Sequence, residues 1–444
     1  MIFKIVTCFI LFSISHSIKD NYITALIKIE KKDIDDIDET DIIHSYERFY
    51  ENPNNHKYNY HPYDDKILNA KKIIDSEIII NDKNIGFSYK YKFLKEGIYK
   101  IIYKFNTPLN STSYLFYYCT SLISIDLSHF DSRYITDTRS MFFMCKSLQF
   151  INFSNFNTIN VINMNEMFYG CENLISLNLS SFITSKLKYA DDLFAYCKSL
   201  KSLDLSNFNT TNIITMNDMF TRCTNLISLN ISNFNTKNVQ HMSSLFFDCK
   251  SLINLNLSNF NTENVVDMSY MFGGCLNLKN LDISNFETYR VEYMDSMFRD
   301  CKSLTTLNLN KFNISNVINL YALFYNCENL VSLNLSNFFA SKKIKSASEM
   351  FYNCKSLELI DLSNFDLSII TDKEKMFEGC PAKVKTKNEI LKNNDNNDKK
   401  LGFFHFKFAF FIIIFIFIIS ISLASIRRNK IQKNKKIFDE YFEF

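Results

Sequence analysis

The sequence is poor in the residues that make sharp corners and has no excess of charge of one sign. Among 444 residues there are only 7 glycines, 4 prolines and no tryptophan. This scarcity argues against a collagen-like chain, a flexible linker array and a fold rich in tight turns. We therefore expect few sharp reversals of the chain. The 50 basic and 47 acidic residues give a formal charge of +3, which is too balanced to attract a phosphate backbone. We therefore expect no nucleic-acid partner.

Signatures of catalysis are missing as well. The chain has no G-x-S-x-G, no H-E-x-x-H, no glycine-rich phosphate loop and no C-x-x-C pair, the patterns that serve acyl transfer, metalloproteolysis, nucleotide binding and zinc binding. Its 7 histidines are dispersed along the sequence. We predict that the protein is not an enzyme and expect neither a metal nor a cofactor.

What the chain does have is apolar sequence, beginning at the N-terminus. Residues 1–17 combine Lys4, an apolar run, and small residues at Ser15 and Ser17. This arrangement is typical of a secretory signal peptide. An uncleaved anchor is the alternative, but the apolar run is shorter than the roughly 20 residues that a membrane span needs.

A second apolar run lies near the C-terminus. Residues 408–426 carry no charge and are long enough to cross a bilayer as a helix. The tail that follows, 427–444, begins with a cluster of basic residues, which predicts that it is cytoplasmic and that the N-terminus is extracellular at the plasma membrane. Tyr441 and Phe444 resemble a tyrosine-based endocytic sorting signal, while attraction of the basic residues to anionic lipid is the simpler role for the tail.

The cysteines define a repeat. After Cys8 they recur every 26 residues, with one interval of 27, at Cys119, Cys145, Cys171, Cys197, Cys223, Cys249, Cys275, Cys301, Cys327, Cys354 and Cys380. A fixed period of this length indicates a solenoid or a propeller. Because a propeller blade needs about 40 residues, we predict a solenoid of about ten units over residues 119–380.

Each unit contains one strand signal and one return segment. In the unit that starts at Cys249, the strand pattern L-x-x-L-x-L ends at Leu257, and V-x-x-M-x-x-M-F ends at Phe272. The three- and four-residue apolar spacing of the return predicts a short helical turn. Phenylalanines equivalent to Phe260 and to Phe272 recur in every unit, so two phenylalanine stacks should run through a core that only neighbouring units can complete.

The unit C-x-S-L-x-x-L-x-L-S-N-F-x-T-x-x-V-x-x-M-x-x-M-F resembles the leucine-rich repeat of BspA-like surface proteins of bacteria and protists. The resemblance implies a leucine-rich-repeat fold, a cell-surface location and adhesion to host cells or extracellular matrix, because several members of that family are adhesins. Units three (171–196) and nine (327–353) depart from the pattern, because the N-F-N-T turn is replaced and lysines enter. The chain lacks a bacterial wall-sorting motif, which favours a eukaryotic membrane protein.

The segments that flank the array differ from it. Residues 18–75 contain acidic and polar runs and are expected to be weakly ordered. Residues 76–118 include an alternating stretch, 77–105, which predicts a small antiparallel β cap. Residues 381–407 are rich in Lys, Asn and Asp and are expected to form a polar stalk.

The repeated cysteines favour free thiols over disulfides. Equivalent side chains in adjacent coils run parallel into the core, and their Cβ atoms should stay farther apart than the roughly 3.8 Å that a disulfide prefers. We expect buried free thiols, with Cys354 and Cys380 at the last coil as the most favourable exception.

Two surfaces are candidates for binding. A polar ladder on the strand face comprises Asn152, Asn178, Asp204, Asn230, Asn256 and Asp282. It is either a solubilising face or a surface for avid contact with a repetitive ligand such as a glycan. N-x-S/T sequons give glycosylation candidates at Asn110, Asn152, Asn178, Asn209, Asn230, Asn256, Asn313 and Asn334.

The second surface is a patch of tyrosine and arginine on the return side. It comprises Tyr270, Tyr289, Arg290, Tyr293 and Arg299, residue types that are enriched in interface hot spots. The lysines of units three and nine, Lys186, Lys188, Lys342, Lys343 and Lys345, are candidates for contact with acidic partners.

These features together predict a single-pass cell-surface protein whose solenoid binds an extracellular protein or glycan in adhesion or recognition. One alternative is a structural or antigenic surface coat with no specific ligand. Another is a receptor that signals through a partner, because the short tail has no room for a signalling domain.

Overall fold

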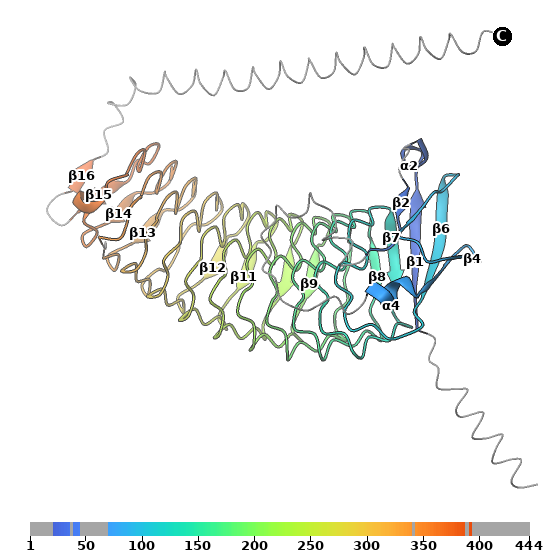
Figure 1. Cartoon of the computed structure of the whole chain (residues 1–444). Helices are drawn as coiled ribbons and strands as arrows, with labels where there is room; N and C mark the ends of the chain where they lie inside the picture. The colour runs from blue at the N-terminus through green and yellow to red at the C-terminus, as the bar shows by residue number, and fades with distance from the viewer. Residues whose placement is uncertain (1–20, 36–38, 45–69, 340–341, 387–389, 393–444) are drawn as a thin grey trace, which may run out of the picture. The chain divides into compact units, whose positions relative to one another are not determined.

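The period of 26 residues becomes one coil of a β-solenoid in a computed structural model that describes residues 21–35, 39–44, 70–339, 342–386 and 390–392. Coil 1 starts at Cys119 and coil 10 at Cys354, and positions within a coil are counted from the cysteine as position 1. In coil 9 the extra residue falls between positions 13 and 17. The coils lie side by side along the solenoid (Figure 1).

Short parallel strands pair neighbouring coils along one face, here called the strand face, in separate sheets. They occupy positions 6–8, and β7 also positions 4 and 5. The central residue of positions 6–8 is apolar and points inward between two outward ones, which are polar except Phe150 and Leu359. Register is strict, because Ser202 pairs with Ser228 and Asn254 with Asn280. The strands of this face are β7 (Leu122–Asp126), β8 (Phe150–Asn152), β9 (Ser202–Asp204), β10 (Ser228–Asn230), β11 (Asn254–Asn256), β12 (Asn280–Asp282), β13 (Ser332–Asn334) and β14 (Leu359–Asp361).

The opposite part of the coil, positions 19–26, is here called the turn face, and our prediction of a helical turn there is wrong. Parallel bridges link position 19 from coil to coil, as in Thr215 with His241. The backbone N–H groups of positions 20, 22, 24 and 26 then donate to carbonyls of the next coil at 2.7–3.2 Å in coil 4. The donors there are Met216, Asp218, Phe220 and Arg222, and the acceptors are His241, Ser243, Leu245 and Phe247.

Intervening amides of the turn face close turns inside the coil. Thr221 N donates to Asp218 O and Cys223 N to Phe220 O, so the segment is a series of nested turns. Positions 22 and 26 take left-handed φ values, such as 55° at Asp218 and 57° at Arg222, which an α-helix cannot contain. The apolar spacing that suggested a helix is met because consecutive turns also return every third residue to the core.

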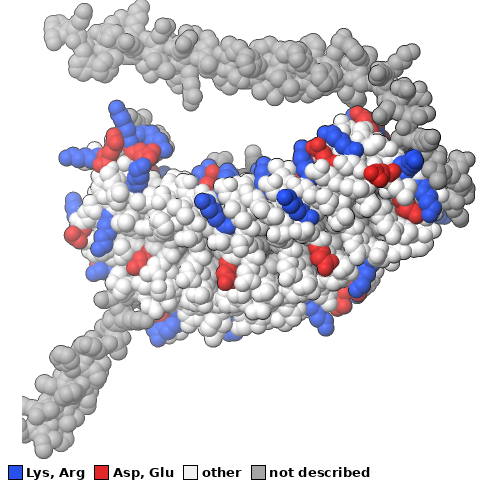
Figure 2. Space-filling model, turned by 180° about the vertical axis from the view of Figure 1, so that it is seen from behind, with Lys and Arg blue, Asp and Glu red and all other residues white. Residues whose placement is uncertain are grey.

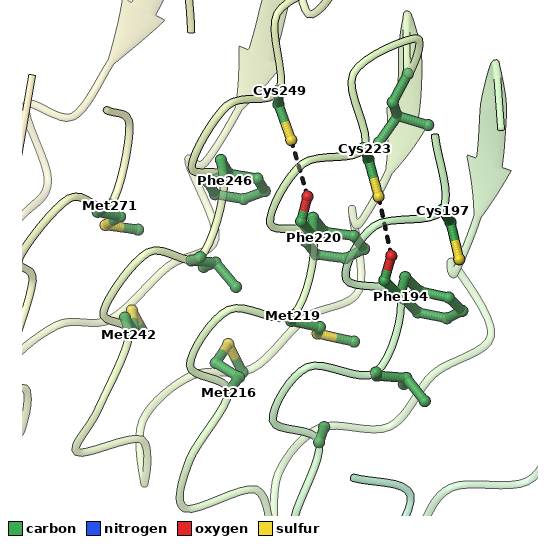
Figure 3. Packing of buried hydrophobic residues seen from close by; sticks show 14 of the residues in the cluster. Phe194, Cys197, Met216, Met219, Phe220, Cys223, Met242, Phe246, Cys249 and Met271 are labelled. Atoms are coloured by element: carbon green, nitrogen blue, oxygen red, sulfur yellow. Dashed lines mark hydrogen bonds between the residues drawn. The ribbon is translucent and has the colours of Figure 1, made fainter. Parts of the chain in front are cut away.

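Two phenylalanine stacks run through the core, as predicted. The rings at position 24, from Phe116 to Phe377, stack at centroid distances of 5.4–5.9 Å with interplanar angles of 2–12°. Those at position 12 are all buried, with centroids 6.1–6.4 Å apart where they stack. Figure 3 shows Phe194, Phe220 and Phe246 in consecutive coils.

The N-terminal end of the solenoid is closed by a sheet that corrects our expectation for residues 18–75. Strand β1 (Tyr22–Ile29) lies antiparallel between β6 (Gly97–Lys104) and β7, the strand of coil 1. Its alternate residues, among them Ile23 and Ile27, are buried. A strand with one buried face needs alternating apolar residues over only about eight positions. This short alternation was hidden by the acidic and polar composition of residues 18–75 as a whole.

The remaining elements of the cap either belong to this sheet or, like the pair β2 (Thr40–Asp41) and β5 (Lys90–Tyr91), lie outside it. The predicted alternating stretch supplies β3 (Glu77–Ile80), β4 (Lys83–Gly86), β5 and β6, and the preceding segment supplies helix α2 (Lys31–Asp35), β2 and helix α4 (Ala70–Ile74). The sheet order is β4-β3-β6-β1-β7-β8. An antiparallel strand from outside the repeat thus covers the edge that coil 1 would otherwise expose.

The C-terminal end of the solenoid is also covered by added strands, and they lie in the segment predicted as the polar stalk. The short 3-10 helix η2 (Leu367–Ile369) lies in coil 10. Beyond it, β15 (Lys383–Lys385) adds a parallel strand to β14, and β16 (Ile390–Lys392) pairs antiparallel with β15. The solenoid also begins before Cys119, because Ser111 already bridges to Asp137.

Several predicted segments lie outside the described residues: the signal peptide 1–17, the span 408–426, the tail 427–444 with Tyr441 and Phe444, and most of the stalk. Within the described part of the chain, no helix has the length and apolar character needed to cross a membrane.

Candidate interaction surfaces

The strand-face ladder has a structural role in every coil. At position 8, Asn or Asp accepts a hydrogen bond through Oδ1 from the backbone N–H two residues later, at 2.9–3.3 Å in all ten coils. Such Asx turns direct the chain out of a strand. The six ladder residues, Asn152, Asn178, Asp204, Asn230, Asn256 and Asp282, are all exposed.

Asx turns recur at two further corners. At position 13, Asn157 accepts from Ile159 N, and at position 19, Asp267 accepts from Ser269 N, at 2.9 and 2.8 Å. Our expectation of few tight turns is therefore wrong, because Asn and Asp make the corners that glycine and proline are too few to make. The position-8 residues were predicted as a surface ladder, although their recurrence at a fixed position also indicates a corner.

Polar side chains also join the coils. Thr236 Oγ1 donates to Asn261 O and accepts from Asn261 N, at 2.7 and 2.8 Å, and the same pair of bonds recurs for Thr158, Thr184, Thr210, Thr262 and Thr288. At position 16, Asn238 and Asn264 donate to carbonyls of the preceding coil. In coils 2–7 the corner at position 14 is thus bonded to the next coil through a threonine hydroxyl.

The sequons lie mostly on the strand face. Asn152, Asn178, Asn230, Asn256 and Asn334 share position 8, and all of them are exposed. Asn209 and Asn313 lie at position 13, also exposed, and Asn110 accepts a hydrogen bond from Lys72 Nζ at 3.3 Å.

Figure 2 shows one side of the molecule, on which charged side chains gather near the two ends and are sparse between them.

The structure does not gather the tyrosine and arginine candidates into one patch. Tyr289 and Arg290 are paired, with the guanidinium 5.8 Å from the ring centroid. The other three lie farther along the coil, with other partners. Tyr293 bridges to Asp267 and Asn319 at position 19, the Tyr270 ring meets Phe247 edge-on, and the Arg299 guanidinium lies 4.0 Å from the centroid of Tyr325.

The lysines of the irregular coils partly replace the asparagines at position 16. Lys186 Nζ donates to Asn160 Oδ1 and Lys343 Nζ to Asn316 Oδ1, both at 2.7 Å. These two lysines therefore preserve a coil-to-coil contact. Lys188, Lys342 and Lys345 are exposed.

A line of acidic side chains on the turn face is electrostatically unfavourable. Glu166, Asp192 and Asp218 occupy position 22 in three consecutive coils. Burial, together with the charges of Asp218 and Glu166, raises the pKa of Asp192 to about 9. In the described residues no group of three or more His, Cys, Asp or Glu side chains is arranged to hold a metal ion.

Opposite charges alternate at position 2 instead. Glu328 lies between Lys302 and Lys355, 2.8 Å from each ammonium group, and hydrogen bonds from these two lysines lower its pKa to about 2. Glu172 is flanked in the same way by Lys146 and Lys198. These exposed triads link three coils each.

The repeat cysteines, including Cys354 and Cys380, are buried and form no disulfide among the described residues. From Cys145 to Cys354, each thiol donates to the carbonyl of the position-24 phenylalanine that lies 29 or 30 residues earlier, two coils back in this counting. The Sγ···O distances are 3.0–3.2 Å (Figure 3). Burial raises the pKa of Cys223 and of Cys275 to about 12. The thiolate that reacts with oxidants or metals is therefore scarce.

One surface feature escaped the sequence reading. Four large apolar side chains are exposed at neighbouring corners of coils 1–3, with exposed fractions of 53% for Tyr134, 42% for Ile159, 38% for Ile162 and 48% for Ile183. Individually they look like ordinary surface residues. Only the coil register shows that they are neighbours.

Comparisons with known proteins give a family and no curated relative. The model of a family described as "Mycoplasma protein of unknown function, DUF285" matches residues 110–229, 222–338 and 277–390. No curated protein matches the chain. Among solved structures, a chain in "Crystal structure of TLR13-ssRNA13 complex" is similar at 18% identity over 60% of this chain and 51% of that chain, with a TM-score of 0.18. The present chain spans about half the length of that chain.

Proposed function

Since this chain belongs to the family described as "Mycoplasma protein of unknown function, DUF285", whose matches span the solenoid, we propose that it is a single-pass cell-surface protein that recognises an extracellular protein or glycan in adhesion. The finer assignment to BspA-like leucine-rich-repeat proteins is part of this proposal and rests on the repeat motif. The extracellular placement rests on the apolar segments 1–17 and 408–426 and on the basic tail.

The observation that carries the proposal is the separation of roles within the coil. Inward positions repeat the same residues, from the phenylalanine stacks to the thiols, whereas outer positions such as 5 and 15 differ between coils. A scaffold with a constant interior and a variable surface is what extended binding surfaces of repeat proteins use. Because nothing catalytic is needed for such a role, the expectation of a non-enzyme stays part of the proposal.

A surface coat without a specific ligand is the second candidate. It is favoured by the strand face, whose polar ladder is explained by Asx turns that the fold itself needs. A receptor that signals through a partner would bind its ligand in the same way and would differ only in the signalling that follows.

The test displays the full chain on cultured cells and measures binding to purified matrix proteins and to other cells. Antibody staining of intact cells checks the extracellular placement of the solenoid. A matched variant lacks coils 5–8, residues 223–326, which joins Arg222 directly to Cys327 and keeps the coil register. Saturable binding by the full chain supports recognition, and its loss in the variant would assign the site to the coils that hold Tyr289 and Arg290. A well-displayed chain that binds nothing would favour the coat.

A further inference from the structure

Coil 3 lacks the hydrogen bond that stabilises the corner at position 13 in most coils, and the residue that replaces the acceptor is not packed in the core. At position 13, seven of the ten coils carry Asn or Asp that accepts the amide of position 15. Coil 3 has Ile183 there, which cannot accept a hydrogen bond and is 48% exposed. A residue that neither closes the turn nor enters the core is not explained by the stability of the coil, and such local exceptions tend to mark functional sites.

Ile183 has apolar neighbours at the same corner. Ile183 N donates to Thr158 Oγ1 at 2.7 Å, next to Ile159 in coil 2. Ile162 N donates to Thr136 O at 2.8 Å, and Asn160 Nδ2 donates at 3.1 Å to the carbonyl of Arg133, next to Tyr134 in coil 1. These hydrogen bonds hold the four side chains, here called the corner patch (Tyr134, Ile159, Ile162 and Ile183), on three successive coils.

Regular coils show that Ile183 at position 13 and Ile159 at position 15 are not properties of the repeat, whereas position 18, the place of Ile162, is apolar in several coils. At positions 13 and 15, coils 4–6 carry Asn209 and Thr211, Asn235 and Lys237, and Asn261 and Glu263. All of these are polar. A contiguous exposed apolar surface with a polar rim is typical of an interaction site.

The rim of the patch is positive. Lys186 and Lys188 lie beside it in coil 3, both exposed. Arg133 is paired with Asp131 at 2.7 Å, so the two lysines set the sign of the local field. Such a rim favours a partner with acidic side chains.

We propose that the corner patch is the docking surface for a protein partner that presents aliphatic or aromatic side chains next to acidic ones. The inference rests on the proposed function and narrows its ligand from protein or glycan to protein. Three isoleucines offer neither hydrogen-bonding groups nor ring faces to a sugar, whereas they can be buried against apolar side chains. The tyrosine is of the type enriched in hot spots.

The experiment pans random peptides displayed on phage against the purified full chain in detergent. Peptides are counter-selected on the double variant Ile159→Gln, Ile183→Asp, which creates no N-x-S/T sequon. The expected pool combines Asp or Glu with apolar residues and binds the double variant about tenfold more weakly. Lys188→Ser should weaken binding by about threefold at low salt and less at high salt.

Two controls separate docking from folding. Ile183→Asp supplies the missing Asx acceptor, as Asp131 and Asp366 do in coils 1 and 10, so the double variant should unfold at no lower temperature than the natural chain. Ile227→Asn with Ile253→Asn removes two exposed isoleucines from the strand face and should leave peptide binding unchanged.

A pool without acidic and apolar enrichment, or one that binds the double variant equally, overturns the proposal. Capture of phosphatidylserine vesicles that depends on the patch, without peptide binding, would also overturn it, because the partner would then be a lipid surface. The outcome is separable from that of the cell-binding test. Displayed chains whose cell binding survives the double variant keep the proposed function without this site, while selective peptides combined with no cell binding retain the site and reject adhesion.

Discussion

The strand face and the turn face of each coil meet their neighbours in different ways. On the strand face, a residue such as Leu203 points inward between the outward Ser202 and Asp204, and the strands pair in parallel. On the turn face, alternate amides donate to the next coil while the others close turns within their own coil. The difference teaches that apolar residues at three- and four-residue spacing do not by themselves specify a helix, because nested turns satisfy the same pattern when a neighbouring coil accepts the freed amides.

The largest effect that would distinguish the two faces comes from the core beneath them. Phe220 is fully buried in the position-24 stack, between Phe194 and Phe246, whereas Leu229 on the strand face is only partly buried. We expect Phe220→Ala to lower the free energy of unfolding by about 3–5 kcal/mol and Leu229→Ala by about 2 kcal/mol. Denaturant unfolding of the two variants measures both values, and equal losses would show that the turn face is no better packed than the strand face.

A smaller effect concerns the corner that joins the two faces. Thr236→Val keeps the shape of the buried side chain but removes the hydroxyl that bonds both backbone groups of Asn261. We expect a loss of about 1–3 kcal/mol in the free energy of unfolding, because a donor and an acceptor are left without their partner.

The control for this corner is Thr211→Val, one position later in coil 4, where the side chain is exposed. Its unfolding should match that of the natural chain within about 0.5 kcal/mol. Coil 8 already carries Ile314 and coil 10 Leu367 in place of the threonine, so the array tolerates such losses at single coils. If Thr236→Val and Thr211→Val behave alike, the threonine ladder does not hold the corners together.

A third effect, which depends on pH, tests the electrostatics of the turn face. Burial and the charges of Asp218 and Glu166 raise the pKa of Asp192 to about 9 in the folded chain, from an ordinary value of 3.8. The folded state therefore keeps a proton that the unfolded state releases, and stability falls as pH rises from about 4 to about 9. Asp192→Asn cannot titrate, so its melting temperature should decline less over this range. If the melting temperatures of the variant and the natural chain change equally with pH, the pKa of Asp192 is not raised.

The sequence predicted the repeat more fully than the ends of the array. The cysteine spacing, the strand positions and both phenylalanine stacks follow from side chains that recur at fixed intervals. Strand β1 could not be predicted with the same ease, because its eight residues form one strand whose partners, β6 and β7, are remote in sequence. Its alternation is visible only when the surrounding acidic residues are set aside.

Candidate surfaces were harder to predict than the core. Asn256 and its equivalents were predicted to form either a solubilising face or a ladder for a repetitive ligand, and in the structure their side-chain oxygens close turns. Tyr134, Ile159 and Ile183 looked unrelated, because they lie at different positions in three successive coils and only the stacking of coils makes them neighbours. Sequence spacing identifies what repeats, while a binding surface is made from what does not.

Hydrogen exchange of the full chain with residue-level mass spectrometry tests the central claim most directly, namely that one backbone network joins the coils on both faces. Amides of the turn-face segment 216–222 should exchange as slowly as those of the neighbouring strands β9 and β10, because four of them donate to coil 5. Fast exchange throughout 216–222, beside protected strands, would contradict the claim and leave the separate strand pairs of the strand face as the backbone connections between coils.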